Sequence, residues 1–282
     1  MELTAGITLA VLGAALLHAG WNALLKGGRD TTLDMAIVVA GSGLVVAPLL
    51  PFLALPARAS WPYIAASMVI HVGYYTALVG TYRAGELSHG YPLMRGVAPL
   101  LVAAFGVLVL GEVPGLWMGL GILLICGGVI AIAFVGGASF LHNRRATAWA
   151  LANAALIACY TLVDGAGVRL SGSAASYAGW MFFLDAFPYF LIVAWLRRRE
   201  LVSYAQRHWR RGLAGGAAST AAYAIALWAM TQAPVAAVAA LRETSVIFAA
   251  FLGTWILKEP LGAARLAGAA AVLCGVIALK GG

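Results

Sequence analysis

Long apolar stretches separated by short polar breaks run through the whole chain. A membrane-spanning helix needs about 20 mostly apolar residues in succession. Ten stretches reach this length, at approximately 4–26, 34–55, 60–82, 89–111, 115–136, 146–167, 176–196, 212–231, 236–257 and 262–280. The breaks between them are too short to hold a soluble domain. The pattern therefore predicts an all-α membrane protein with ten transmembrane helices.

Two charged segments recur at a fixed spacing. Arg95 lies in an apolar stretch that closes with Glu112, and Arg242 lies in one that closes with Glu259. Both pairs are 147 positions apart (242 − 95 and 259 − 112), which maps the third to fifth predicted helices onto the eighth to tenth. Because five is an odd number, the second set of helices enters the membrane inverted. We predict two inverted five-helix repeats, residues 1–140 and 141–282, with a site between them, as in many secondary transporters.

The composition supports a membrane protein. Hydrophobic residues make up 63% of the chain and charged residues 10%, which excludes an ordinary soluble domain. The net charge of +8 comes from basic residues that flank apolar stretches, so we expect no nucleic-acid partner. Cys126, Cys159 and Cys274 all fall in apolar stretches without a CxxC pair. They are interpreted as buried apolar residues, and we expect no metal or cofactor.

The basic residues also predict an orientation. Of 18 Lys and Arg, Arg95 and Arg242 lie within helices, 13 lie on one predicted side, and only Arg58, Arg169 and Lys280 lie on the other. Cytoplasmic loops are enriched in Lys and Arg. The bias places the 197–211 loop in the cytoplasm and both termini outside. The first apolar stretch has no basic residues before it and is interpreted as a membrane helix rather than a cleaved signal peptide.

Several local patterns resemble a known family. Apolar segments ending in Gly111-Glu112 and Lys258-Glu259, each followed by a short turn and a glycine-dotted helix, resemble the EamA family of the drug/metabolite transporter superfamily. Trp21-Asn22 through Lys26 resembles its opening pattern, with His18 where tryptophan is common, and Cys159-Tyr160-Thr161 resembles the second-half counterpart. The resemblance implies a ten-helix carrier for small metabolites, often an exporter. Members are often placed with both termini inside; we follow the charge count instead.

The two intramembrane arginines are the first candidates for the site, since charge inside a membrane is costly and usually functional. Pro92 and Pro99 flank Arg95, and Pro99 cannot donate to the carbonyl of Arg95, which predicts a kink. Arg95 and Arg242 are therefore candidate binding groups for an anionic substrate. Glu243 is a further candidate. The structural alternative is an ion pair in which Glu243 neutralises Arg95, whereas the adjacent Arg242 and Glu243 point in different directions.

Aromatic and titratable residues complete the predicted site. The residues predicted to line a cavity are Trp21, Asn22, Tyr74, Tyr75, Tyr160, Tyr223 and Trp228. Asp185, His71 and His18 are candidate proton carriers, because a carboxyl without water tends to hold a proton and histidine titrates near neutral pH. An ion pair for Asp185 and hydrogen-bonded packing roles for the histidines remain open. Asp164 lies nearer a helix end and is a weaker candidate.

Other residues fit structural roles. The tryptophans predicted to anchor helix ends at the membrane interface are Trp61, Trp149, Trp195 and Trp209. Glu112 and Glu259 are interpreted as structural residues at helix ends. Gly115 and Gly119 form a GxxxG pattern that permits close helix approach, expected inside one chain more than at a homodimer face.

These patterns favour a secondary transporter in the cytoplasmic (inner) membrane, most simply an exporter. The expected substrate is a small polar or amphipathic metabolite that carries a carboxylate or phosphonate, such as an amino acid, with protons or a counter-substrate as partners. The form YPxxRGxxP at Tyr91–Pro99 also resembles members associated with phosphonate use. A flippase for a lipid-linked head group and an exporter of cationic or aromatic drugs are the alternatives. No GxxxxGK[ST], GxSxG or HExxH pattern occurs, so no ATPase or enzyme activity is expected.

Overall fold

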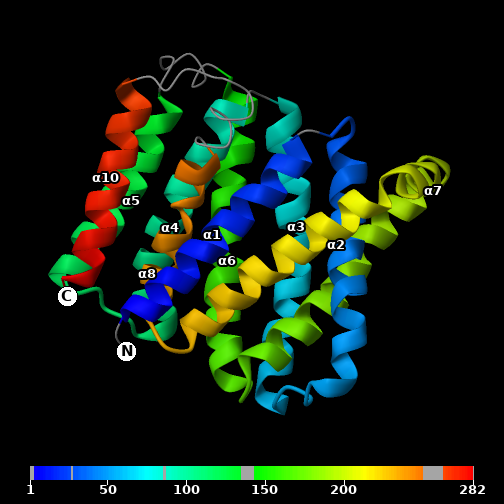
Figure 1. Ribbon diagram of the computed structural model, residues 1–282, viewed down its shortest axis with the longest axis horizontal. Helices are drawn as coiled ribbons and strands as arrows, with labels where there is room; N and C mark the ends of the chain where they lie inside the picture. Colours follow the sequence, from blue (N-terminus) through cyan, green and yellow to red (C-terminus); the bar gives the residue numbers. More distant parts are fainter. Residues whose placement is uncertain (1–2, 27, 85–86, 135–142, 250–262, 282) are drawn as a thin grey trace.

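The computed structural model describes residues 3–26, 28–84, 87–134, 143–249 and 263–281, and the regular structure within those ranges is helical (Figure 1). The elements are α1 (Ala5–Lys26), α2 (Thr31–Val46), η1 (Ala47–Phe52), η2 (Arg58–Ser60), α3 (Trp61–Ala84), α4 (Leu87–Leu110), α5 (Leu116–Ala133), α6 (Arg144–Leu170), α7 (Ala174–Met230), α8 (Val235–Arg242) and α10 (Ala263–Lys280). Both termini lie at the lower end of the bundle in Figure 1.

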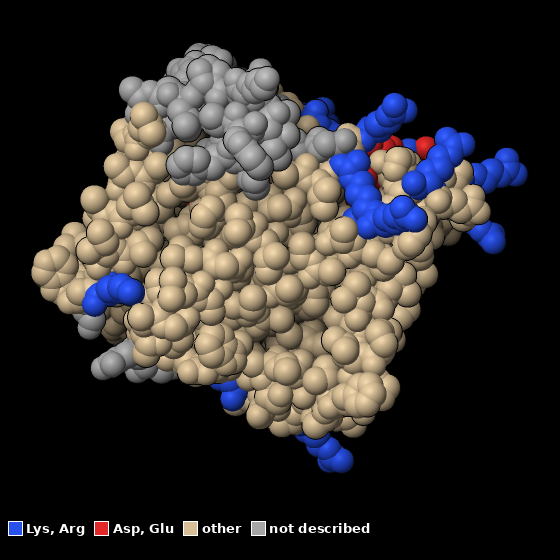
Figure 2. Space-filling model, in the orientation of Figure 1, with Lys and Arg blue, Asp and Glu red and all other residues tan. Residues whose placement is uncertain are grey.

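The helices have the length and surface expected in a membrane. Among the described residues, six helical spans are long and apolar enough to cross a bilayer, and Leu116–Ile132 and Leu266–Lys280 are shorter apolar helices. Large apolar side chains such as Leu9, Phe52 and Trp195 are exposed on the outside, where lipid rather than water would contact them. Most of the visible face in Figure 2 carries no charge. The chain is an integral membrane protein.

Capping side chains explain where several helices begin. Asp30 precedes α2 and its carboxylate accepts hydrogen bonds from the amides of Thr32 and Leu33. Asn143 caps α6 and Ser173 caps α7 in the same way. These side chains satisfy amides that have no partner within the first turn of a helix. The predicted boundaries at these positions agree with the structure to within a few residues.

Helix α7 corrects one prediction. The segment 197–211 was expected to be a loop between two membrane helices, but it is helical within a 57-residue element. Backbone angles leave the helical region only at Arg197 (φ −137°) and His208 (φ −122°). The chain therefore changes direction at two kinks instead of through a loop, and the apolar parts on either side match the predicted segments 176–196 and 212–231.

The two prolines of α4 do not interrupt its helix. Helix α4 is continuous from Leu87 to Leu110 through both Pro92 and Pro99. The interruption lies instead in its proline-free counterpart, where α8 ends at Arg242, a turn occupies 243–244 and helix resumes over 245–249. Residues 250–257 of the predicted ninth helix lie outside the described residues, as does Glu259.

Helices α2 and α7 contact each other through glycine. A Cβ atom placed on Gly216 would lie 2.4 Å from the amide nitrogen of Ser42, and one on Gly41 would lie 2.2 Å from the carbonyl oxygen of Gly212. The Ser42 hydroxyl also donates to the carbonyl of Gly216 at 3.3 Å. The backbones are thus in direct contact, a packing mode that small residues allow in membranes.

Helices α5 and α10 pack in the same manner, through glycines other than those predicted. A Cβ on Gly121 would approach the Gly275 carbonyl to 2.8 Å, and one on Gly128 would approach the Gly268 carbonyl to 2.7 Å. Gly115 and Gly119 have no atom within 4 Å of such a Cβ. The expected close approach at Gly115 and Gly119 within one chain is therefore absent among the described residues, and a homodimer face stays a prediction.

The cysteines are free, and only one has the predicted environment. Cys126 is buried, whereas Cys159 and Cys274 are exposed. The prediction that all three are buried is wrong for these two. Their apolar surroundings in the sequence reflect the outer surface of the bundle, where apolar residues are as common as in its interior.

Candidate functional site

A small cavity lies between α1, α2, α3, α6, α7 and α8. Its volume is about 40 Å³, which is space for a few water molecules at ~10–15 Å³ each. The aromatic residues in its wall are Trp21, Tyr74, Tyr75, Tyr160, Phe182 and Tyr223. Its polar lining consists of His18, Ser42, His71, Ser219 and Arg242. The predicted aromatic residues therefore meet in one place, although they come from helices far apart in the sequence.

Two of the predicted lining residues lie elsewhere. Trp228 is 39% exposed and does not line the cavity, so that prediction is wrong: its side chain faces the outside of the bundle. Asn22 is buried but also does not line the cavity. Its amide donates to the carbonyl of His18 at 2.9 Å and its oxygen accepts from the hydroxyl of Tyr82 at 3.3 Å. Asn22 therefore joins α1 to α3.

Arg95 is paired with Glu243. The Arg95 Nε and the Glu243 Oε2 are 2.8 Å apart, and both side chains are almost completely buried. The N–H is not aligned with that oxygen, since both atoms lack a hydrogen-bond partner, so the contact is an ion pair more than a directed hydrogen bond. This is the arrangement that the sequence offered as the structural alternative. Arg95 does not line the cavity.

Arg242 is in a different situation. It is 6% exposed, lines the cavity, and its Cζ lies 4.7 Å from the centroid of the Tyr223 ring. No carboxylate of the described residues lies within ion-pair distance of it, including the adjacent Glu243. A guanidinium over an aromatic face is stabilised by a cation–π interaction, which does not neutralise its charge. Arg242 is thus the positive group that the cavity presents.

The histidines differ in how fully they are bonded. His18 accepts a hydrogen bond at Nδ1 from the Trp21 indole N–H at 3.2 Å, so that nitrogen carries no proton. His71 Nδ1 lies 2.9 Å from the carbonyl oxygen of Ser67. A carbonyl can only accept, so this nitrogen carries the hydrogen. The His71 ring also stacks on Tyr160 with centroids 4.5 Å apart.

Two aspartates lie behind the tyrosines of the cavity. Asp185 accepts a hydrogen bond from the Tyr75 hydroxyl at 2.5 Å. Asp164 accepts from the hydroxyls of Tyr177 at 2.9 Å and Tyr223 at 2.8 Å. Asp164, which the sequence analysis ranked lower because it lies nearer a helix end, is fully buried. Its partners are 13 and 59 positions away, and no sequence pattern connects them.

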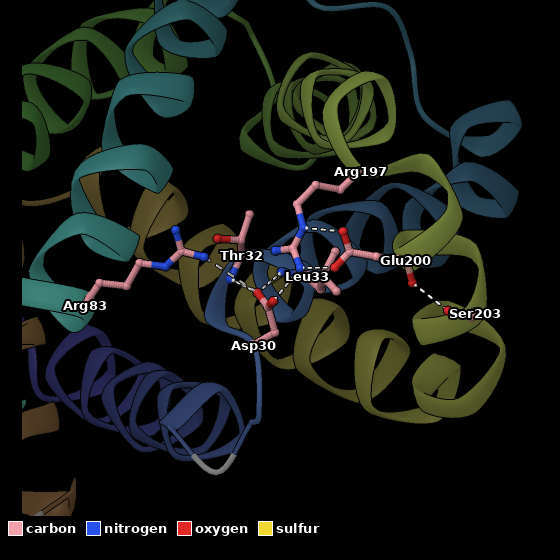
Figure 3. A network of polar contacts seen from close by, with 7 residues as sticks. All are labelled: Asp30, Thr32, Leu33, Arg83, Arg197, Glu200 and Ser203. Atoms are coloured by element: carbon pink, nitrogen blue, oxygen red, sulfur yellow. Dashed lines mark hydrogen bonds and ion pairs between the residues drawn. The ribbon is translucent and has the colours of Figure 1, made fainter.

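Ion pairs link helices at each end of the bundle. After α4, Glu112 contacts Arg169 of α6 at 2.6 Å and accepts the amide of Val235 at the start of α8 at 2.8 Å. Arg169 also donates to the Met230 carbonyl at 2.8 Å. This confirms a structural role for Glu112. After α1, the Asp30 carboxylate lies 2.8 Å from Arg197 at the first kink of α7 and 3.9 Å from Arg83 at the end of α3 (Figure 3).

Asp30 is held in its charged form. Partial burial acts to raise the pKa of Asp30, but hydrogen bonds from Arg197 and from the amides of Leu33 and Thr32 outweigh it and lower the pKa below its usual value. Arg197 is in turn bonded to Glu200 of the next helical turn (Figure 3). The network therefore connects the start of α2 with α3 and α7 at this end.

We expect Asp30→Asn to lower stability above about pH 4 by about 0.2–1 kcal/mol, the range for partly exposed ion pairs. Asparagine keeps the helix cap, so the difference reports the charge. Because the folded pKa is below the unfolded value of ~3.9, the parent's advantage is complete above that value and is lost as the pH falls through the folded pKa. Thermal unfolding in detergent from neutral to acidic pH measures this. A difference that is unchanged at acidic pH would contradict it.

Comparison with known proteins gives a family and a fold. Residues 144–280 match the model of a family described as the EamA-like transporter family. No curated protein matches the chain. A crystal structure whose name states no function is similar to this chain with a TM-score of 0.77 and 17% sequence identity, covering 98% of this chain and 96% of that one. At this identity the likeness concerns the fold alone.

Proposed function

Since this chain belongs to the EamA-like transporter family, we propose that it is a secondary transporter that exports a small metabolite bearing a carboxylate or phosphonate group. The family places it among membrane transporters of the drug/metabolite superfamily. The finer proposal is alternating access to the cavity, between halves formed by residues 1–140 and 141–282, in exchange for protons or a counter-substrate. The export direction comes from the family resemblance.

The state of Arg242 is the observation that carries the substrate class. Of the two intramembrane arginines, Arg95 is neutralised by Glu243 at 2.8 Å, while Arg242 lines the cavity without a carboxylate partner among the described residues. Burying an unpaired charge is costly unless a partner arrives. An anionic group of the substrate would supply that partner, and the surrounding tyrosine rings would contact its apolar part.

The contacts of α5 and α10 support an inverted repeat. Gly121 and Gly268 are 147 positions apart, as are Gly128 and Gly275. Gly121 meets Gly275 and Gly128 meets Gly268. Each glycine of the first pair of positions therefore contacts the repeat equivalent of the other glycine. Such an exchange is what a two-fold axis between the halves produces. The axis would lie in the membrane plane because the two helices run in opposite directions.

The distribution of charge supports the proposed orientation. Lys and Arg gather over the kinked end of α7 in Figure 2, which contains the basic residues between Arg197 and Arg211. By the positive-inside rule this end would face the cytoplasm. The termini lie at the other end of the bundle (Figure 1), so we keep the proposal that both are outside.

The size of the cavity fits a closed intermediate of the transport cycle. Sites for drug-sized ligands usually have volumes of ~300–1,000 Å³, far more than the 40 Å³ found here. Ion pairs of Glu112 and Asp30 tie helices together at the two ends. Opening on either side would therefore break one of these networks and widen the cavity around Arg242.

A thermal-shift screen of detergent-purified protein tests the proposal. We expect methylphosphonate or phenylalanine to raise the unfolding temperature by mass action, and choline and adenosine to have little effect. Arg242→Gln should weaken the response to anions by about tenfold or more, because the charged partner is lost. The matched control is Arg58→Gln, since Arg58 is exposed and lies in η2, away from the cavity.

Two outcomes would overturn the anion site. One is a response to choline or adenosine alone, which would favour a drug exporter. The other is an unchanged response to anions in Arg242→Gln. Stabilisation by lipid-linked head groups without any response to soluble compounds would favour the flippase instead.

A further inference from the structure

The buried charges of the described residues do not balance. The six buried charged side chains are Arg95, Arg242, Asp34, Asp164, Asp185 and Glu243. Asp34 faces Arg211 at 3.7 Å near the end of the bundle. This leaves two arginines and three carboxyls in the interior. Since an uncompensated buried charge is very costly, the interior has to bind one additional proton, either on one of these carboxyls or on the buried His71.

Hydrogen bonding identifies the carboxyl that holds this proton. Asp164 accepts two tyrosine hydroxyls, one at each oxygen, which is the solvation that a carboxylate requires. Asp185 accepts a single hydroxyl at Oδ2, and its Oδ1 has no partner in the described structure. A neutral carboxyl tolerates such an environment better than a carboxylate. Among the carboxyls, Asp185 therefore offers the environment that best suits a bound proton.

The titratable and charged groups around Asp185 and Asp164 come from α3, α6, α7 and α8. The hydroxyls of Tyr75, Tyr177 and Tyr223 bond the carboxyls directly. Behind them, Tyr189 contacts the Tyr75 ring, Tyr160 stacks on His71, and Arg242 lies over the Tyr223 ring. His71 interacts electrostatically with both aspartates. The two carboxyls also interact electrostatically with each other.

Tyr223 connects this pair to the substrate site. Its hydroxyl donates to Asp164, and the Arg242 Cζ lies 4.7 Å from the centroid of its ring. We propose that Asp185 binds a proton in the empty transporter and that an anion at Arg242 draws a second proton onto Asp164. This inference rests on the proposed anion site. When the anion neutralises Arg242, Arg95 remains as the single positive charge beside the carboxylates of Asp164 and Glu243, because Asp185 already holds a proton. A second proton, on Asp164, makes the buried charges equal again.

The proposal has a direct consequence for transport. Anion and proton are bound together instead of competing, so they cross the membrane in the same step. A proton gradient directed into the cell would then oppose export of the anion. Export would have to be driven by the gradient of the metabolite itself or by a counter-substrate, which favours exchange against a solute over exchange against protons.

Infrared spectroscopy of the purified protein tests the proton on Asp185 without any substrate. We expect a band of a protonated carboxyl at neutral pH that is lost in Asp185→Asn. Asparagine resembles a neutral carboxyl in size and charge, so the fold is retained. Tyr75→Phe removes the hydroxyl that bonds Asp185 and should shift the band. The control Asp30→Asn should leave it unchanged. A parent protein without the band, or Asp185→Asn with it, would overturn the proton site.

The linkage is tested with phenylacetate, which stays ionised near neutral pH. Phenylacetate should bind the parent more tightly at about pH 6 than at about pH 8, by at most about tenfold per pH unit for one linked proton. Asp164→Asn should bind with little pH dependence. Equal affinity of the parent at both values would overturn the linkage. No thermal response to phenylacetate at either pH would overturn the anion site and the linkage with it, while the infrared band alone decides whether Asp185 holds a proton.

Discussion

Replacing Glu243 with alanine is expected to lower the free energy of unfolding by about 3–5 kcal/mol, the cost of leaving one member of a buried ion pair alone. Arg95 is 2% exposed and its Nε lies 2.8 Å from Glu243. Neither water nor another carboxylate of the described residues could replace the lost partner. Thermal or denaturant unfolding of detergent-purified protein measures the loss.

A double variant distinguishes the effect of the unpaired charge from the effect of altered packing. In the double variant with Arg95→Met and Glu243→Met, both charges are absent, and we expect most of the lost stability to return. Glu200→Ala serves as the control, since Glu200 is exposed and bonded only within its own helix among the described residues. A cost for Glu243→Ala no larger than that of Glu200→Ala would mean that Arg95 finds other compensation.

Gly216→Leu is expected to cost about 3 kcal/mol or more, because overpacking that has to move backbone exceeds the usual range for side chains. A Cβ on Gly216 would lie 2.4 Å from the Ser42 amide and 2.5 Å from the Gly41 carbonyl carbon. These are backbone atoms and cannot rotate away as a side chain does. Helices α2 and α7 would have to separate, and the cavity wall at Val38 and Ser42 would move with them. Thermal unfolding together with the substrate response reports both effects.

Gly13→Leu is the matched control for this steric effect. Gly13 lies in α1, is exposed, and has no atom within 4 Å of a Cβ placed on it. Leucine favours a helix over glycine by about 1 kcal/mol, so this change should stabilise the protein slightly. If both variants lost the same stability, a general effect of leucine on folding in the membrane, and not contact between α2 and α7, would be responsible.

The sequence predicts the helices well because their signal is local. Runs of about 20 apolar residues mark membrane-spanning stretches, and most described helices lie in or near the predicted ranges. The ninth range, 236–257, is interrupted by a turn at 243–244 and continues beyond the described residues. The same signal fails between Arg197 and Arg211. A polar stretch between two apolar ones looks like a loop, but two residues with non-helical angles, Arg197 and His208, are enough to turn the chain while the rest stays helical.

The faces of the helices are harder to predict. In a soluble protein the polar side of a helix points to water, but here both the interior and the lipid-facing surface are apolar. Trp228 and Cys159 were therefore assigned to the interior although they face outward. Tyr74, Tyr75, Tyr160 and Tyr223 were assigned to the cavity because they lie in helices that could surround it, and they do line it.

Long-range pairing was predictable only where charge required it. A buried arginine needs a carboxylate, and few are available in membrane segments, so Glu243 was an obvious partner for Arg95. Asp164 gives no such signal, since its partners are neutral tyrosines of α7. Which arginine stays unpaired also depends on a turn at Glu243–Thr244. No proline in this segment predicts that turn. These details depend on how the helices pack, which a single sequence does not specify.

Gly121 meets Gly275 and Gly128 meets Gly268. In the proposed inverted repeat, α5 and α10 would therefore touch through the same two positions of each half. A surface that fits its own copy allows two identical chains to associate. An ancestral protein of five helices with this surface could have functioned as a pair inserted in opposite directions. Duplication and fusion of its gene would then have joined partners that were already in contact. On this history, the contact between α5 and α10 existed before the two halves were joined in one chain.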